Sequence, residues 1–240
     1  MAGDMYGLLW ERELPVEGRG RRPGRPSGLS RERIVAEATA IADAEGLHQV
    51  SMKRIADGLD CGVMSLYRHV PGKDELVALM YDATMADAPP LPEFADWRDA
   101  MHAWAMAVRT LFRAHPWALP LATANHMMGP GEAYWLDWAL GVFTRTGLDA
   151  DVSLAAVLAV NGYVGGALRP ELQGQDDPQW FRFMRHPAAA ERFPNVQRLI
   201  DSGGIADSPV LKDSFEFGLG LVLDGLERYI ETRPRPGGEP

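Results

Sequence analysis

The fold is decided by residues 51–70, which read SMKRIADGLDCGVMSLYRHV. Ser51 is a candidate N-cap for a short helix over residues 52–59. A tight turn follows, and residues 62–70 form the next expected helix, with Leu66 on its inner face. Two short helices joined by a tight turn are the arrangement with which a helix-turn-helix places one helix in the major groove of DNA. An ordinary helical hairpin is the alternative.

The turn and the outer face of the second helix carry more specific signals. Ala56 is small, so the second helix can cross close to the first. Asp60 stands where the turn requires a positive φ, which Asp tolerates better than most residues, though less well than Gly. The outer face combines apolar, hydroxyl and cationic groups suited to thymine methyl groups, phosphates and guanine: Val63, Met64, Ser65, Tyr67 and Arg68.

The rest of the chain predicts an all-α protein of two domains preceded by an arm. Apolar residues recur at helical spacing, and no strand pattern of comparable strength is present. The proline-rich stretch at 88–95 marks a domain boundary, so a three-helix domain is expected over 30–88, a larger helical domain over 96–233 and a basic, flexible arm over 1–29. Helices are expected from Ser30 to Gly46, from Lys73 toward Ala88, and over 97–115, 132–146, 152–168, 188–202 and 209–230.

Charge is distributed unevenly along the chain. The net charge is −9, yet residues 19–33 contain six arginines and one glutamate. A basic arm on an acidic body directs nucleic acid to one end of the molecule, although a solvated tail has the same composition. Within the arm, Arg22-Pro23-Gly24-Arg25-Pro26 resembles an AT-hook core with its residues out of order. Arg22 and Arg25 are therefore candidates for minor-groove contacts.

Residues 55–76 resemble the DNA-binding signature of the bacterial tetracycline-repressor (TetR) family. The resemblance is carried by Leu66-Tyr67-Arg68-His69-Val70 and by Lys73, which opens the next helix, and it extends over about residues 30 to 85. The remainder resembles the ligand-binding and dimerisation domain of that family more weakly. Two positions depart from the family pattern. The family usually has Gly at the position of Asp60 and a branched apolar residue at the position of Cys61.

The resemblance implies a role for each matching residue. Tyr67 and Lys73 are expected to hold backbone phosphates, with Lys73 aided by the dipole of the helix that it begins. Ser51 and Lys53 are expected to do the same from the first helix of the motif. The residues expected in or beside the major groove are Gly62, Val63, Met64, Ser65, Arg68 and His69, with Arg68 the best candidate for a guanine contact.

The second domain is rich in large aromatic residues. Five of the seven tryptophans lie between residues 97 and 138, among methionines and a few polar side chains. Such a set lines a pocket for a bulky apolar or aromatic ligand, and equally it makes a packed core. The candidate ligand-binding residues are Trp97, Met101, His102, Trp104, Phe112, Asn125, Met128, Trp135, Trp138 and Asn161.

Two helices are candidates for a homodimer interface, residues 152–168 and 209–230. The first is apolar nearly all round, and Gly218 and Gly220 let the second approach a neighbour closely. Burial of both helices within one subunit is the alternative. The first helix has no charge but is close to the lower length limit for a membrane span and contains Asn161, so we expect a soluble helix and no membrane.

Enzyme signals are poor. No Gly-x-Ser-x-Gly motif is present, and the six histidines include no i,i+4 pair for a metal. The single cysteine, Cys61, falls in the motif turn, where it is expected to be a packing residue, and one cysteine fits a reducing cytoplasm. No catalytic residue, metal or cofactor is therefore expected.

These observations predict a cytoplasmic, homodimeric DNA-binding regulator of transcription. The resemblance implies a repressor that a small hydrophobic or aromatic effector releases from a palindromic double-stranded DNA operator. A helical small-molecule carrier or enzyme with a vestigial DNA-binding domain is the first alternative. An architectural DNA-binding protein governed by the arginine arm is the second.

Overall fold

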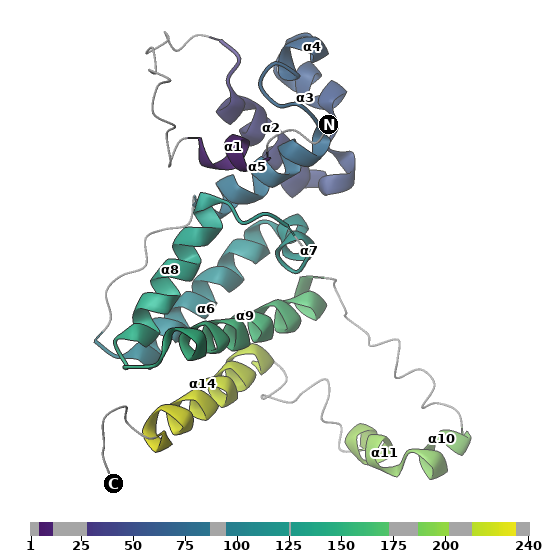
Figure 1. The fold of residues 1–240 in the computed structure, drawn as a ribbon. Coiled ribbons are helices and arrows are strands. Elements are labelled where there is room, and N and C mark those ends of the chain that lie inside the picture. The colour runs from purple at the N-terminus through teal and green to yellow at the C-terminus, as the bar shows by residue number, and fades with distance from the viewer. Residues whose placement is uncertain are drawn as a thin grey trace. The chain divides into compact units, whose positions relative to one another are not determined.

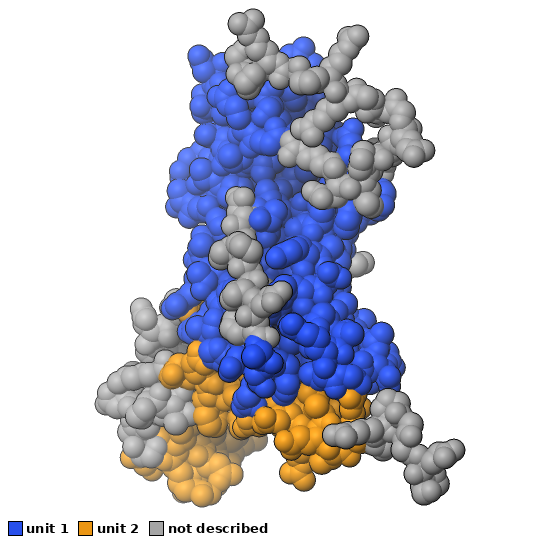
Figure 2. Space-filling model, turned by 90° about the vertical axis from the view of Figure 1, so that its left-hand side faces the viewer, with its two compact units in different colours: residues 1–157 blue, residues 158–240 orange. Residues whose placement is uncertain are grey.

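The computed structural model describes residues 5–11, 28–86, 95–124, 126–172, 187–201 and 213–233, which form helices and connecting turns without a strand (Figure 1). The prediction of an all-α fold with an N-terminal helix-turn-helix is confirmed. The chain divides into two compact units, Met1–Val157 and Leu158–Pro240 (Figure 2). The expected domain boundary at 88–95 falls almost wholly outside the described residues.

The first unit contains most of the helices. They are α1 (Met5–Trp10), α2 (Arg31–Glu45), the 3-10 turn η1 (Leu47–Gln49), α3 (Met52–Gly58), α4 (Val63–Leu66), α5 (Lys73–Ala86), α6 (Trp97–Ala114), the 3-10 turn η2 (Pro116–Ala118), α7 (Leu119–Ala122) and α8 (Pro130–Thr144). Helix α9 (Ala150–Leu172) begins in this unit and continues into the second. The second unit also holds α10 (Pro187–Arg192), α11 (Pro194–Asp201) and α14 (Ser214–Thr232).

Helix α2 begins and ends where its sequence predicts. The Ser30 hydroxyl accepts a hydrogen bond from the backbone N–H of Arg33 at 3.3 Å, and Gly46, at φ 91°, ends the helix. Each of α2, α3, α4 and α5 contributes at least one completely buried side chain, among them Ile34, Ile55, Leu66 and Leu76. This common core fixes the short helices α3 and α4, which are too short to be stable alone.

The end of α5 packs closely against the start of α8 (Figure 1). The backbone N–H of Gly131, at the start of α8, donates to Asp82 Oδ1 of α5 at 2.8 Å. A Cβ atom at Gly131 would lie 2.5 Å from the Asp82 carbonyl oxygen, so this approach requires glycine. The contact joins the helix that follows the helix-turn-helix to the helices beyond it.

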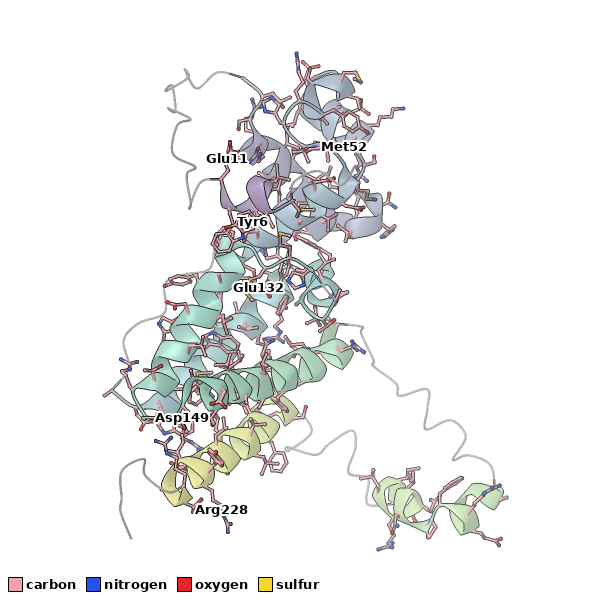
Figure 3. All side chains as sticks on the ribbon, viewed as in Figure 1. Tyr6, Glu11, Met52, Glu132, Asp149 and Arg228 are labelled. Atoms are coloured by element: carbon pink, nitrogen blue, oxygen red, sulfur yellow. The ribbon has the colours of Figure 1, made fainter. Side chains whose placement is uncertain are left out.

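Helix α1 is a feature that the sequence analysis included in the arm. Leu9 is buried, and Arg31 of α2 donates to the carbonyl oxygen of Leu8 at 3.3 Å. Figure 3 shows Tyr6 and Glu11 near the two ends of this short helix. Six residues are too few to show helical periodicity, so the sequence gives no signal strong enough to separate α1 from the arm.

In the second unit, α9 and α14 are held together by Tyr163. Its hydroxyl lies 2.9 Å from the Ser214 carbonyl oxygen and 2.8 Å from that of Phe215, and it donates to them. A Cβ atom at Gly218 would lie 2.3 Å from the Tyr163 hydroxyl oxygen. Gly218 therefore allows a close approach within one subunit, and its expected role in a dimer interface stays a prediction.

Three expected helices differ in extent from the structure. α4 covers only four residues of the expected 62–70, and residues 67–69 continue as a turn in which Val70 N–H donates to the Leu66 carbonyl oxygen at 2.9 Å. The expected helix 188–202 is interrupted between α10 and α11 at Phe193, because Pro194 lacks an N–H donor. The start of the expected helix 209–230 lies outside the described residues, and α14 begins at Ser214.

One helical segment among the described residues, Ala150–Arg169, is long and apolar enough to cross a membrane. About a third of its most apolar window is buried within the chain (33%). Length and composition do not separate a membrane span from a helix that a protein partner covers. The prediction that this helix belongs to a soluble protein stays a prediction.

Candidate functional site

The turn between α3 and α4 has the conformation that the sequence predicts. Asp60 has a φ of 49°, the positive value expected at that position. The next N–H, that of Cys61, donates to the Ala56 carbonyl oxygen at 3.0 Å and closes the turn. The side chains of Ala56 and Leu66 are buried beneath it. The departures from the family pattern at Asp60 and Cys61 are therefore compatible with the motif.

The expected outer face lies on α4 and the turn directly after it, and we call it the reading face: Val63, Met64, Ser65, Tyr67 and Arg68. Met64 is 76% exposed and Tyr67 is 43% exposed, whereas Leu66 and Val70 are completely buried. Gly62 and Arg68 are exposed as well, and Val63, Ser65 and His69 are half-buried. An exposed methionine on a helix otherwise packed against a core is available to a partner.

Arg68 is held by its neighbour one turn earlier. Its Nη2 donates to Ser65 Oγ at 3.0 Å. The spacing i,i+3 places these side chains on one helix face, whereas the resemblance implied a separate groove contact for each. The hydrogen bond reduces the freedom of the guanidinium before any partner binds.

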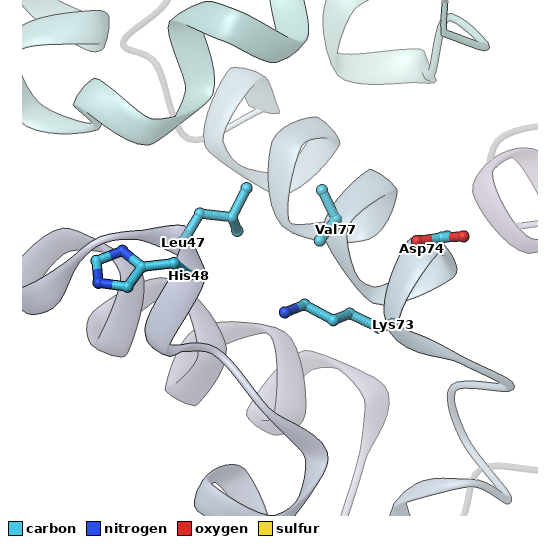
Figure 4. A pocket seen from close by; sticks show the side chains of 5 residues that line it. All are labelled: Leu47, His48, Lys73, Asp74 and Val77. Carbon is cyan, nitrogen blue, oxygen red and sulfur yellow. The ribbon is translucent and has the colours of Figure 1, made fainter.

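Basic residues flank the reading face at the starts of α3 and α5. Ser51 caps α3 by accepting from the Arg54 N–H at 3.3 Å, and Lys53 is exposed. Lys73 is the first residue of α5, and its side chain extends toward η1 (Figure 4). It lines a hollow of about 520 Å³ with Leu47, His48, Asp74 and Val77. Arg22 and Arg25, expected to enter the minor groove, lie outside the described residues.

An ion pair that sequence reasoning missed holds α3 against the end of α2. Arg54 donates to both carboxylate oxygens of Glu45, through Nη1 to Oε2 at 2.9 Å and through Nη2 to Oε1. The hydrogen bond from Arg54 holds the pKa of Glu45 below its ordinary value. The two residues are nine positions apart on different helices, so no helical spacing in the sequence predicts the pair.

The aromatic residues of α6 and α8 form a packed core. Trp104 Nε1 donates to the Trp135 carbonyl oxygen at 3.2 Å, and the two rings meet edge to face with centroids 6.1 Å apart. Trp135 Nε1 donates in turn to the Met85 carbonyl oxygen of α5 at 2.9 Å. Met101 and Phe112 are buried as well. Four candidate ligand-binding residues therefore lie in packed positions, and two of them have satisfied N–H groups.

The other candidate ligand-binding residues are more exposed. Trp97, His102 and Trp138 are half-buried, and the Trp97 ring contacts Phe143. Met128 is exposed, and its carbonyl oxygen accepts a hydrogen bond from Trp10 Nε1 at 3.1 Å. Asn161 is exposed on α9, in the second unit. Asn125 lies outside the described residues. The assignment of these residues to an effector stays a prediction.

Two polar clusters link α2 and α5 to the segments between α6 and α8. In one, Asp43 Oδ1 accepts from His115 Nδ1 at 2.7 Å and from Trp117 Nε1 at 2.6 Å. Trp117 is buried, so this bond satisfies an N–H that has lost water. These long-range partners have no sequence spacing that could have revealed them.

In the second cluster, Glu132 accepts from His126 Nε2 at 2.7 Å and lies 3.5 Å from the Tyr81 hydroxyl. Burial, followed by the nearby Glu132 carboxylate, raises the pKa of Tyr81. Burial opposes the charged form of His126, but hydrogen bonds to the Ala124 carbonyl and to Glu132 raise its pKa overall.

Comparison with known families finds two matches along this chain. Residues 34–80 match the model described as bacterial regulatory proteins, tetR family. Residues 89–230 match the tetracyclin repressor-like C-terminal domain. The first range contains the whole helix-turn-helix, and the second contains the aromatic core and the helices α9 and α14.

Similar individual proteins cover nearly the full length. The HTH-type transcriptional repressor DrrR1 of Streptomyces coeruleorubidus is 34% identical over 242 residues, covering 94% of this chain and 86% of that protein. The apo structure of ActR from Streptomyces coelicolor is similar with a TM-score of 0.72 and 27% identity, covering 86% of this chain and 99% of ActR. ActR in complex with actinorhodin has a TM-score of 0.70 and 28% identity, covering 84% of this chain and 96% of that one.

Proposed function

Because the chain belongs to the TetR family of bacterial transcriptional regulators, we propose that it is a repressor that a small apolar or aromatic effector releases from a palindromic operator. The family consists of DNA-binding regulators and not of enzymes. Regulation of transcription requires access to DNA, so the protein acts inside the cell, and we place it in the cytoplasm. The single observation that carries the proposal is the exposed face of α4.

DNA binding is supported by the chemistry of that face. Met64 offers apolar surface to thymine methyl groups, and Arg68 offers a planar donor pair to guanine. Tyr67 is exposed directly after α4 and Lys73 is exposed at the start of α5, and both carry groups that bind phosphates. The carrier or enzyme alternative gives no reason for these exposed side chains to be retained around a buried Leu66.

A homodimer is supported by the apolar surface of α9 and α14. Leu158 on α9 is 57% exposed, and Phe217 and Leu221 on α14 are 56% and 58% exposed. Phe217 and Leu221 are four residues apart and share one face of α14. Helices α9 and α14 from each of two subunits would form a four-helix contact that covers these side chains and sets the spacing of the two reading helices.

The class of effector is supported by the aromatic core and by a similar protein. ActR has been solved in complex with actinorhodin. In the present chain, Trp104 and Trp135 form the centre of an aromatic set between α6 and α8. We infer that an effector binds beside this set in the first unit, at the half-buried candidates Trp97, His102 and Trp138. The effector must bind the DNA-free state more tightly than the DNA-bound state. An effector with equal affinity for both states would not change the fraction of protein bound to DNA.

The test is selection of DNA fragments from the source genome by the purified protein at near-physiological salt. The expected result is a small set of palindromic sites that is lost with Tyr67→Ala and with Lys73→Ala. Arg145→Ala, an exposed cation at the end of α8, is the matched control and should retain the sites. Recovery of no site, or of A/T-rich DNA equally by all variants, would contradict a specific regulator.

A further inference from the structure

A groove of about 920 Å³ lies in the first unit, between α1, α2, α5 and the start of α8. Its walls include Leu9 of α1, Val35 of α2, Leu79 of α5 and Tyr134 of α8. The volume falls within the range of small-molecule sites in proteins. The groove is separate from the expected effector site, because none of the nine candidate residues that the structure describes lines it.

Small residues leave the groove open. Ala36 and Ala40 of α2 are one helical turn apart, and Ala83 of α5 also lines the groove. Ala36 and Ala40 are exposed, and larger side chains at these three positions would fill part of the groove. A slot between two helices that is lined by alanine methyl groups accepts a flat apolar group.

Two carboxylates line this slot from different helices, Asp43 of α2 and Asp82 of α5. Asp43 Oδ1 accepts from His115 Nδ1 and Trp117 Nε1, and Asp82 Oδ1 accepts from the Gly131 N–H at 2.8 Å. These bonds fix both carboxylates in place without a ligand. A pre-positioned carboxylate loses little entropy when it accepts a further donor.

The charge of the lining is acidic. Glu32 adds a third carboxylate, and Arg31 is the one lysine or arginine among the described residues that line the groove. Arg31 is already engaged with α1, since its Nη1 donates to the Leu8 carbonyl oxygen and its Nη2 lies 3.7 Å from Glu11 Oε2. The charge that complements the groove is therefore positive.

We propose that this groove is a second small-molecule site, which binds a flat apolar molecule carrying a protonated amine or an equivalent N–H cation. The apolar group lies between the alanine positions of α2 and α5. The cationic N–H groups donate to Asp43 and Asp82. The proposal requires only the groove and its charges, and it does not depend on operator binding.

Direct binding of two flat dyes tests the site. Rhodamine 6G has a flat apolar ring system that carries a positive charge and N–H donors. Fluorescein has a similar ring system but is an anion. Fluorescence anisotropy with the full chain should show binding of rhodamine 6G and not of fluorescein. Asp43→Asn combined with Asp82→Asn keeps hydrogen-bond acceptors but removes charge, and it should weaken rhodamine 6G binding about tenfold or more.

Matched variants locate the dye. Ala40→Trp should abolish binding by filling the slot, whereas Asp137→Asn, on α8 but not in the lining, should leave binding unchanged. Equal affinity for both dyes, no binding of rhodamine 6G, or full binding by the double Asn variant would overturn the site. Operator selection by the same wild-type protein separates the two proposals, because loss of either activity alone leaves the other intact.

Discussion

The Arg68 guanidinium donates to Ser65 Oγ at 3.0 Å, so the proposed guanine-reading side chain is positioned by a neighbour on the same exposed face. Arg68→Lys keeps the positive charge but removes the planar donor pair. We expect this variant to lose about 1–3 kcal/mol of operator affinity and to relax the preference at one base of each half-site. Competition titrations with single-base operator variants measure both effects. A uniform loss across all base variants would show that Arg68 contacts phosphate instead.

Lys73 is predicted to neutralise a phosphate from the start of α5. Lys73→Ala should weaken binding to operator and to unrelated DNA alike. The slope of log K against log salt concentration should fall by about 1 for each phosphate that the variant no longer neutralises. Arg145→Ala removes one exposed cation at the end of α8, away from the proposed interface, and should leave the slope unchanged. An unchanged salt slope in Lys73→Ala would show that Lys73 contacts no phosphate in the complex.

Asp43 is predicted to stabilise the first unit through the buried Trp117 N–H. Asp43→Ala leaves that donor without its acceptor, which costs about 1–3 kcal/mol in the free energy of unfolding. Asp43→Asn keeps an acceptor oxygen and should cost less. Urea denaturation of the two variants beside wild type measures the difference. Equal stability of Asp43→Ala and wild type would mean that Trp117 finds another partner.

His126 gives the fold a pH-dependent contribution. Its pKa is raised in the folded state, so the stabilisation is complete below the unfolded pKa of about 6.5 and is lost as pH rises through the folded value. Glu132→Gln removes the charged partner and should destabilise more at pH 6 than at pH 9. Urea unfolding of wild type and Glu132→Gln at both pH values checks this. A difference between the two proteins that grows with pH would contradict the assigned direction.

The proposed dimer rests on exposed apolar residues of α14. Leu221→Asp places a charge on that face, and we expect it to convert a dimer into a monomer at micromolar concentration, because an unpaired charge in an apolar interface is costly. Sedimentation velocity reports the change in mass. Leu199→Asp, at an exposed leucine of α11, is the control and should stay dimeric. A monomeric wild type would refute the interface directly.

Local signals in the sequence predicted much of the fold. N-caps at Ser30 and Ser51, the Gly46 stop and the positive φ at Asp60 all depend on near neighbours, and each is present in the structure. The contacts between Asp43 and Trp117 or between Glu45 and Arg54 depend on how distant helices pack. No spacing along the chain encodes such pairs, so these contacts could not be predicted.

The candidate sites differ in the same way. The exposed face of α4 could be predicted, because a helix packed through Leu66 and Val70 must turn Met64 and Tyr67 outward. The sequence could not separate aromatic residues of the core from residues that line a pocket. Composition does not show which indole N–H groups have hydrogen-bond acceptors. The groove beneath α1 also lies beyond sequence reasoning, since its lining residues come from four helices and from His115.

The most direct test of the central claim compares a selected operator with the same operator carrying five extra base pairs between its half-sites. Two reading helices held by one dimer require half-sites about one helical turn apart, and the insertion turns one half-site to the opposite face of the DNA. Anisotropy titration at about 150 mM salt should show at least a hundredfold loss of affinity, toward the level of unrelated DNA. Equal affinity for both duplexes would contradict a dimer that reads a palindrome through α4.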